Sequence, residues 1–303
     1  MGDFSAGRAL GAGFRLIGRE PLAILVWALL YFVVGMLPQM AVMAAIFPDW
    51  ARLTHAIATS AGQTPPGSLE MFRAQAKMMQ LQPVTWLTGI VVQALLLGAI
   101  YRAVLMPDER RFFYLRLGGR EAWLGFVLLV LFVMIAIAAF VITLPTAIVS
   151  GIIAAMARDT PALGLLVLVV VVAAVWLLTW LFLRLSLATP MSFDQRAFRL
   201  YESWDLTRGH AGKMFLVGLA LALIFIAAEL ALIAVGLTLS GGLPSLERLG
   251  AWFRDPAFDI KSLAPWAIGG GLGLSLVASL GFALFGGAWA EIYRELAADP
   301  GEA

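Results

Sequence analysis

The chain has 303 residues, of which 61% are hydrophobic and only 13% are charged, and its formal net charge at pH 7 is +2. Soluble globular domains carry about 25% charged residues, so this composition excludes an ordinary soluble protein. The shortage of charge also excludes a disordered chain, which needs the reverse composition, and a nucleic-acid-binding protein, which needs a basic surface.

Six apolar stretches follow one another along the chain, each long enough for the roughly 20 helical residues that cross a bilayer core. Apolar residues are consecutive and do not alternate with polar ones, which favours helices. The predicted spans are 22–46, 84–105, 122–148, 163–188, 214–239 and 265–290. Pro38 and Pro145 are expected to kink spans 1 and 3. We therefore predict an all-α integral membrane protein, with residues 1–303 forming a single membrane domain.

Basic residues in the connections predict the orientation. Lysine and arginine are about twice as frequent in the two terminal segments and in the connections 2–3 and 4–5 as in the other connections. Because cytoplasmic loops carry the excess of positive charge, the N-terminus and the C-terminus are both expected to be cytoplasmic. The outer loops are then 48–83, with two possible short helices, and 240–264. Neither is long enough for an independent catalytic domain.

The connections also suggest an internal repeat. A Leu-x-Gly-Arg-Glu string occurs before span 1 and before span 3, and a degraded form precedes span 5. Apolar residues at helical spacing in 4–17 and 191–208 predict amphipathic helices there. Such helices either lie among the lipid headgroups or pack beneath the bundle. The fold expected is six transmembrane helices as three pseudo-repeated hairpins, each preceded by a cytoplasmic amphipathic helix. The possible repeats are 1–107, 108–190 and 191–303.

Glu229 is the one acidic residue well inside a predicted span. It lies 16 residues after Lys213, about 24 Å along a helix axis and past the bilayer midplane. An ionisable group at that depth suggests a proton relay or a partner for a cation. A structural acid, hydrogen-bonded in the bundle or reaching the outer interface, is the favoured alternative because the spans contain no complementary base.

Arg102, Arg184 and Arg294 recur at the cytoplasmic ends of the even-numbered spans. Together they would bind a lipid phosphate or an acidic segment of a partner. The favoured alternative is that each arginine anchors its own helix at the interface. Glu291 lies three residues before Arg294 and is expected to pair with it.

Small residues recur at every fourth position of span 6. They are Gly271, Ser275, Ser279, Ala283 and Gly287. A stripe of this kind lets another helix approach closely. Contact within the chain, against span 1 or span 5, is favoured over contact between two copies in a homo-oligomer.

The chain shows no catalytic constellation. Cysteine is absent, and the two histidines, His55 and His210, fall on opposite sides of the membrane in this topology. There is no His-Glu-x-x-His, Gly-x-Ser-x-Gly or P-loop motif. We expect a protein that is not an enzyme and that has no cofactor and no metal.

The connection between spans 4 and 5 carries a resemblance. It contains Arg184, Leu185, Ser186, Leu187, Ala188 and Pro190, followed by Ser203, Trp204, Leu206, Thr207, Arg208 and Gly209. This pattern resembles the membrane-domain family that is fused to glycerophosphoryl diester phosphodiesterases and that also occurs as stand-alone bacterial membrane proteins. The resemblance implies a six-helix protein of the bacterial cytoplasmic (inner) membrane. Catalysis in the fused members belongs to an attached soluble domain, so no functional residue is carried over.

Two functions fit these features. The favoured one is a non-enzymatic inner-membrane protein, surrounded by phospholipid, that anchors or assists a protein partner in lipid or envelope metabolism. The alternative is a transporter or lipid translocase, which Glu229 and the two prolines would serve. The spans contain few polar residues, which argues against a hydrophilic path.

Overall fold

The computed structural model describes residues 4–59, 68–156, 161–239 and 264–298, and the regular structure within these ranges is helical. Six helical stretches are long and apolar enough to cross a membrane. They are Pro21–Trp50, Gln75–Leu105, Arg111–Ala155, Gly164–Gln195, Ala211–Leu239 and Ala267–Ala297. The prediction of an all-α protein with six such helices is confirmed. The second predicted outer loop, apart from its last residue, lies outside the described residues.

The first span consists of α2 (Pro21–Leu30), η1 (Tyr31–Met36) and α3 (Leu37–Thr59). η1 is π-helical, and the Leu37 N–H bonds to the Phe32 carbonyl five residues earlier. Pro38 has no N–H and its ring crowds the carbonyl four residues before it, so a wider turn at this point relieves the conflict. The interruption in the regular α-helix thus lies next to the predicted kink residue.

The short helices predicted in the loop at 48–83 are instead continuations of the membrane helices. α3 runs on to Thr59, and α4 (Ser68–Leu105) begins well before its predicted span. Pro48 and Pro83 lie inside these helices without ending them. α3 and α4 pack side by side, and an ion pair of 2.6 Å between Lys77 and Asp49 joins them. Neighbouring helices make internal prolines tolerable.

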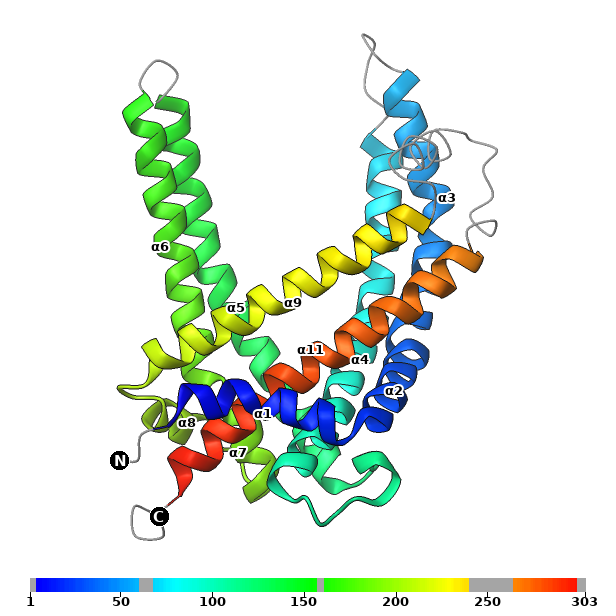
Figure 1. Cartoon of the computed structure of the whole chain (residues 1–303). Helices are drawn as coiled ribbons and strands as arrows, with labels where there is room; N and C mark the ends of the chain where they lie inside the picture. Colours follow the sequence, from blue (N-terminus) through cyan, green and yellow to red (C-terminus); the bar gives the residue numbers. More distant parts are fainter. Residues whose placement is uncertain (1–3, 60–67, 157–160, 240–263, 299–303) are drawn as a thin grey trace.

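The remaining spans form two further pairs. α5 (Gly119–Met156) and α6 (Pro161–Leu185) form a hairpin, and α9 (Ala211–Leu239) and α11 (Ala264–Ala297) are the last two spans. In Figure 1 the α3–α4 and α5–α6 pairs stand on opposite sides and spread apart toward the upper end, while α9 and α11 run obliquely between them. α11 is central, because it contacts α1 (Ala6–Arg19), α2, η1, α4 and α9.

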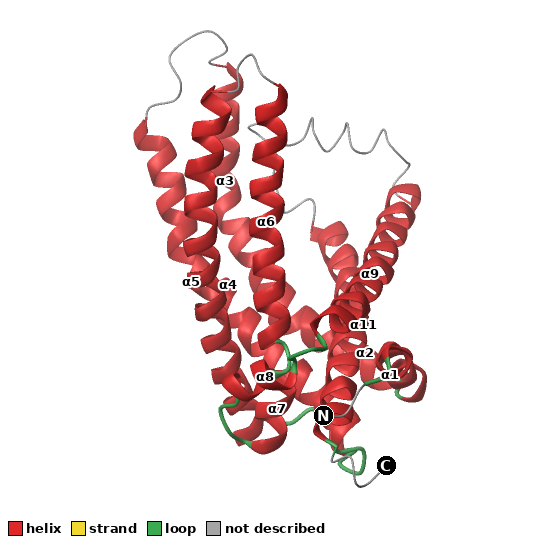
Figure 2. Cartoon of the chain, turned by 90° about the vertical axis from the view of Figure 1, so that its left-hand side faces the viewer, coloured by secondary structure: helices red, strands yellow, loops and turns green. Residues whose placement is uncertain are grey.

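One end of the molecule, which we call the basal end, holds α1 and two short helices, α7 (Ala188–Gln195) and α8 (Leu200–Leu206) (Figures 1 and 2). Most of the large buried side chains belong to two clusters here. One cluster includes Trp27, Leu124 and Phe193, and the other includes Met214 and Ile292.

The helices away from the basal end are apolar on the outside. Leu165, Val169, Val172 and Trp176 of α6 are each more than half exposed. Exposed apolar side chains all along a helix are expected where the surrounding solvent is lipid.

The segments predicted as amphipathic helices fold in three different ways. α1 buries Ala9, Ala12, Gly13 and Leu16 against the bundle. The described residues 106–118 form no such helix, and contain only the short η2 (Arg111–Tyr114), whose last three residues have positive φ. The prediction of a helix before span 3 is therefore wrong, because left-handed residues cannot continue an α-helix.

The single helix predicted at 191–208 is also wrong, since Arg196 at φ 53° separates α7 from α8. A left-handed residue at this position ends a helix. α7 is buried from Ala188 to Phe193 and lies within the protein. The threefold repeat stays a prediction.

Candidate functional site

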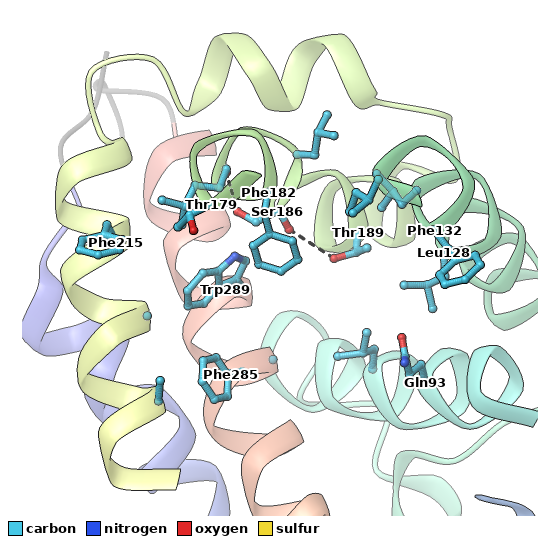
Figure 3. Close-up of a pocket in the computed structure, with 18 of the residues that line it drawn as sticks. Gln93, Leu128, Phe132, Thr179, Phe182, Ser186, Thr189, Phe215, Phe285 and Trp289 are labelled. Carbon is cyan, nitrogen blue, oxygen red and sulfur yellow. Dashed lines mark hydrogen bonds between the residues drawn. The ribbon is translucent and has the colours of Figure 1, made fainter. Parts of the chain in front are cut away.

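A cavity of about 610 Å³ lies between α4, α5, α6, α9 and α11, where the helix pairs spread apart. This volume falls within the range of small-molecule sites, about 300–1,000 Å³. Figure 3 shows its walls, which include Gln93, Leu128, Phe132, Thr179, Phe182, Phe215, Phe285 and Trp289. Aromatic and aliphatic side chains make up most of this surface, so the cavity suits an apolar occupant.

The hydroxyl groups around the cavity are already bonded within the protein. The Tyr101 and Thr189 hydroxyls lie 2.7 Å apart, and Thr189 also donates to the Ser186 carbonyl at 3.4 Å. Ser186 and Thr179 donate to carbonyls of α6 at 2.8 and 2.9 Å. Because these hydroxyls are satisfied internally, the cavity can be filled by hydrocarbon without leaving them unpaired.

Arg102 is buried at the end of α4, where several groups of the protein surround its guanidinium. Its side chain is 2% exposed, and its Nε lies 3.3 Å from the Glu109 carboxylate. Its terminal nitrogens donate to the Glu121 carboxylate and, at 2.5 Å, to the Tyr114 carbonyl. The Phe193 ring centroid lies 5.7 Å from the guanidinium carbon. Arg102 therefore ties α4 to the start of α5 and is not free to reach a headgroup.

Arg184 lies beside a pair of tryptophan rings, Trp180 and Trp204, whose centroids are 5.0 Å apart in an edge-to-face contact. Its guanidinium carbon is 5.5 Å from the Trp180 ring centroid and 5.4 Å from that of Trp204. It donates to the Trp204 carbonyl at 3.3 Å, and Ser203 donates to the Arg184 carbonyl at 2.9 Å. Arg184, Ser203 and Trp204, which belong to the pattern that carries the resemblance, thus connect α6 to α8.

Arg294 is half-exposed and pairs with Glu291 at 2.6 Å, which confirms the predicted pair. Glu291 is buried, and its carboxylate also lies 3.8 Å from Arg15 of α1. The three recurring arginines therefore have separate partners and surroundings, and the described contacts do not bring them together into one site.

The small-residue stripe of α11 faces α1 and the first span of the same chain. Ser275, Ser279 and Ala283 are completely buried. A Cβ on Gly271 would meet the Phe32 ring at 3.0 Å, and one on Gly287 would meet the Gly13 Cα at the same distance. Contacts within the chain thus occupy this face of α11.

Glu229 is half-buried on α9. It follows the cavity residue Ala222 by seven positions, which places it on the same side of α9 and about 10 Å further along the axis. No ion pair joins its carboxylate to another residue of the described ranges. Glu229 lies beyond the cavity walls.

Sequence reasoning missed the cavity and the carboxylate partners of Arg102. Glu121 carried a usable signal, because an acid in the first turn of a long apolar helix needs a partner when it is buried. Within the described ranges, no three His, Asp or Glu side chains gather in a way that could hold a metal ion. Comparisons with protein-family models, with curated proteins and with solved structures find no match.

Proposed function

We propose that this protein is a non-enzymatic, multi-pass protein of a bacterial cytoplasmic membrane that holds the acyl chain of a bilayer lipid in its central cavity. In doing so it assists a protein partner in lipid or envelope metabolism. The observation that carries this proposal is the apolar cavity of about 610 Å³ among the membrane helices. An empty cavity deprives its lining of dispersion contacts, and the surrounding acyl chains are the nearest apolar groups that can fill it.

Two further features support the proposal. The pattern between Arg184 and Gly209 resembles the membrane domain that accompanies glycerophosphoryl diester phosphodiesterases, enzymes that act on lipid-derived substrates. The excess of arginine around the basal end supports a cytoplasmic position for that end. A partner in the cytoplasm or at the inner leaflet would then meet α1 and α8.

A photoactivatable phospholipid with a diazirine in its acyl chain tests the cavity. Ala222 lines it, so Ala222→Trp should fill part of the space and reduce labelling of cavity peptides several-fold. Ala227→Trp is the matched control, because Ala227 is exposed on the same helix and does not line the cavity. Equal labelling of the two variants and the unsubstituted protein would contradict an acyl chain in the cavity.

A lipid translocase is the second candidate, and the position of Glu229 beyond the cavity on the same side of α9 favours it. A carboxyl group there would couple lipid movement to a proton. Glu229→Gln should then abolish scrambling of a fluorescent lipid in proteoliposomes that hold a proton gradient. Unchanged scrambling in this variant would exclude the proton-coupled version.

A further inference from the structure

A second cavity, of about 720 Å³, opens at the basal end and is lined largely by charge. Four of its lining residues are arginines and two are glutamates, so its walls carry an excess of positive charge. They come from the end of α4, the 106–118 connection, the first turn of α5 and Arg196 after α7. We call this cavity the arginine pocket.

The two glutamates of the arginine pocket already have partners within the protein. Glu121 accepts from Arg102 and from the Gly118 N–H, the latter at 3.1 Å. Glu109 lies 3.3 Å from Arg102 and 2.8 Å from Arg116. These contacts neutralise Arg102 and Arg116 and leave the other two arginines of the pocket to be accounted for.

Arg120 and Arg196 lack close carboxylate partners. The Arg120 side chain is 21% exposed and lies 3.8 Å from Glu109. Its one hydrogen bond is to the Met106 sulfur, a weak acceptor, and its buried Nε has no acceptor. Arg196 makes no ion pair with any residue in the described ranges. A guanidinium without a close carboxylate is able to bind an oxyanion through two parallel N–H groups.

The backbone adds to the attraction for an anion. The pocket includes Gly118 and Gly119 at the start of α5, a helix of 38 residues. The first N–H groups of a helix have no intrahelical acceptor, and the helix dipole is positive at that end. A Cβ built on Gly119 would enter open space, so a ligand can approach the backbone there. The Phe193 ring lies 5.7 and 6.0 Å from the guanidinium carbons of Arg102 and Arg120 and helps to orient both.

We propose that the arginine pocket binds a phosphate group, with Arg120, Arg196 and the first turn of α5 as its ligands. The arginine pocket is close to the apolar cavity described above. Arg102 lines the arginine pocket, and the preceding residue, Tyr101, lines the apolar cavity. The phosphate is carried by the headgroup of a phospholipid or by a soluble phosphate compound. The lipid source rests on the proposed function, whereas the phosphate site itself does not.

Binding is measured on the full chain purified in a phosphate-free non-ionic detergent. One arm adds inorganic phosphate or glycerol phosphate and follows the thermal unfolding midpoint. The other arm adds phosphatidic acid or, as its uncharged counterpart, diacylglycerol, and counts retained molecules by native mass spectrometry. The double variant Arg120→Gln/Arg196→Gln removes the two guanidinium groups of the pocket that have no carboxylate closer than 3.8 Å. Arg208→Gln is the matched control, because Arg208 is exposed at the basal end and does not line the pocket.

We expect phosphate-bearing ligands to bind the unsubstituted protein and Arg208→Gln, and to bind the double variant at least tenfold more weakly. Binding of phosphatidic acid alone identifies a lipid headgroup as the source, and binding of glycerol phosphate alone identifies a solute. Equal binding by the double variant, or binding of none of these phosphates to the unsubstituted protein, overturns the proposal. If the double variant does not fold, exposed Arg196→Gln alone is compared with Arg208→Gln. Ala222→Trp alters the apolar cavity and not the arginine pocket, so it should keep phosphate binding. Failure of the acyl-chain proposal is therefore distinguishable from failure of the phosphate site.

Discussion

Arg102 and Glu121 show how single charged residues are accommodated in this protein. Their side chains are only 2% and 5% exposed, and they join helices that are neighbours in the fold. Bringing both charges out of water is costly, and removing Glu121 takes away the buried carboxylate of Arg102 and leaves it only Glu109, 3.3 Å from its Nε. The pair therefore stabilises the basal end only when it is complete.

Glu121→Gln is expected to lower the free energy of unfolding by about 3–5 kcal/mol, the usual cost of breaking a buried ion pair. The measurement is denaturant unfolding in detergent micelles. Glu202→Gln serves as the control, because Glu202 pairs with Arg199 at an exposed position and its loss should leave the midpoint nearly unchanged. The double variant Arg102→Met/Glu121→Leu should recover much of the stability, since it removes both charges. A stability loss equal for Glu121→Gln and Glu202→Gln would contradict a special role for the buried pair.

Arg184→Gln is expected to lower the free energy of unfolding by about 1–2 kcal/mol, because it removes the cation that lies near both the Trp180 and Trp204 rings. Arg184→Lys keeps the charge but loses the planar group that stacks on the rings, so its loss should be intermediate. Thermal unfolding with tryptophan fluorescence reports both stability and this contact. Arg208→Gln is again the control, and an equal effect of the two substitutions would argue against the stacked arrangement.

Among the elements, α1 and α11 pack with their backbones close together because Gly13 and Gly287 have no side chains at the contact. A Cβ on Gly13 would lie 2.5 Å from the Leu284 Cα, and a Cβ on Gly287 would lie 3.0 Å from the Gly13 Cα. The two backbones thus approach as closely as small-residue motifs allow in membrane helices. Gly13, which by propensity alone only weakens a helix, is a packing residue here.

Gly13→Ala should therefore separate α1 from α11 and lower the free energy of unfolding by about 1–3 kcal/mol, as overpacking does. Gly18→Ala in the same helix meets nothing within 4 Å and should stabilise α1 by up to about 1 kcal/mol. Hydrogen exchange of the α1 amides gives a direct measurement, with faster exchange expected only in the Gly13 variant. Similar exchange in both variants would show that the close approach is unimportant.

Element types and boundaries differ in how well the sequence predicts them. The number and approximate positions of the six apolar helices are confirmed, because about 20 consecutive apolar residues specify such a helix locally, but bounds such as Gln75–Leu105 and Arg111–Ala155 exceed the predicted spans. The helix before span 3 is wrong because its prediction used the repeated sequence string alone, and the single helix at 191–208 is wrong because its prediction used apolar spacing alone. Positive φ at Phe112, Phe113, Tyr114 and Arg196 arises at residue types that ordinarily avoid it. No local pattern signals these positions.

At the scale of the whole molecule, the basal end is compact and the opposite end is open. The buried clusters lie around α1, α2, α4, α7 and α11, whereas the helix pairs diverge away from them (Figure 1). The apolar cavity lies between the helix pairs, whereas the arginine pocket lies at the basal end itself. The orientation of the molecule in the membrane decides which compartment meets the arginines.

The absence of cysteine makes that orientation directly measurable. Tyr201→Cys introduces a thiol on α8 at the basal end, and Leu239→Cys introduces one at the far end of α9; the native side chains are 87% and 79% exposed. With a membrane-impermeant maleimide on intact cells from which any outer membrane has been removed, Leu239→Cys should be labelled. Tyr201→Cys should react only after permeabilisation. The reverse pattern would place the basal end outside and contradict the distribution of basic residues.

The sequence by itself predicted the six helices that are long and apolar enough to cross a membrane, because hydropathy and span length are properties of consecutive residues. It also located Glu229, the paired Glu291 and Arg294, and the stripe of small residues on span 6. Only the tertiary structure decided that Arg102 pairs with Glu121, that Gly13 meets Gly287, and which residues line the apolar cavity and the arginine pocket. These depend on helix crossing angles, which arise from many distant contacts together and leave no trace in the order of neighbouring residues.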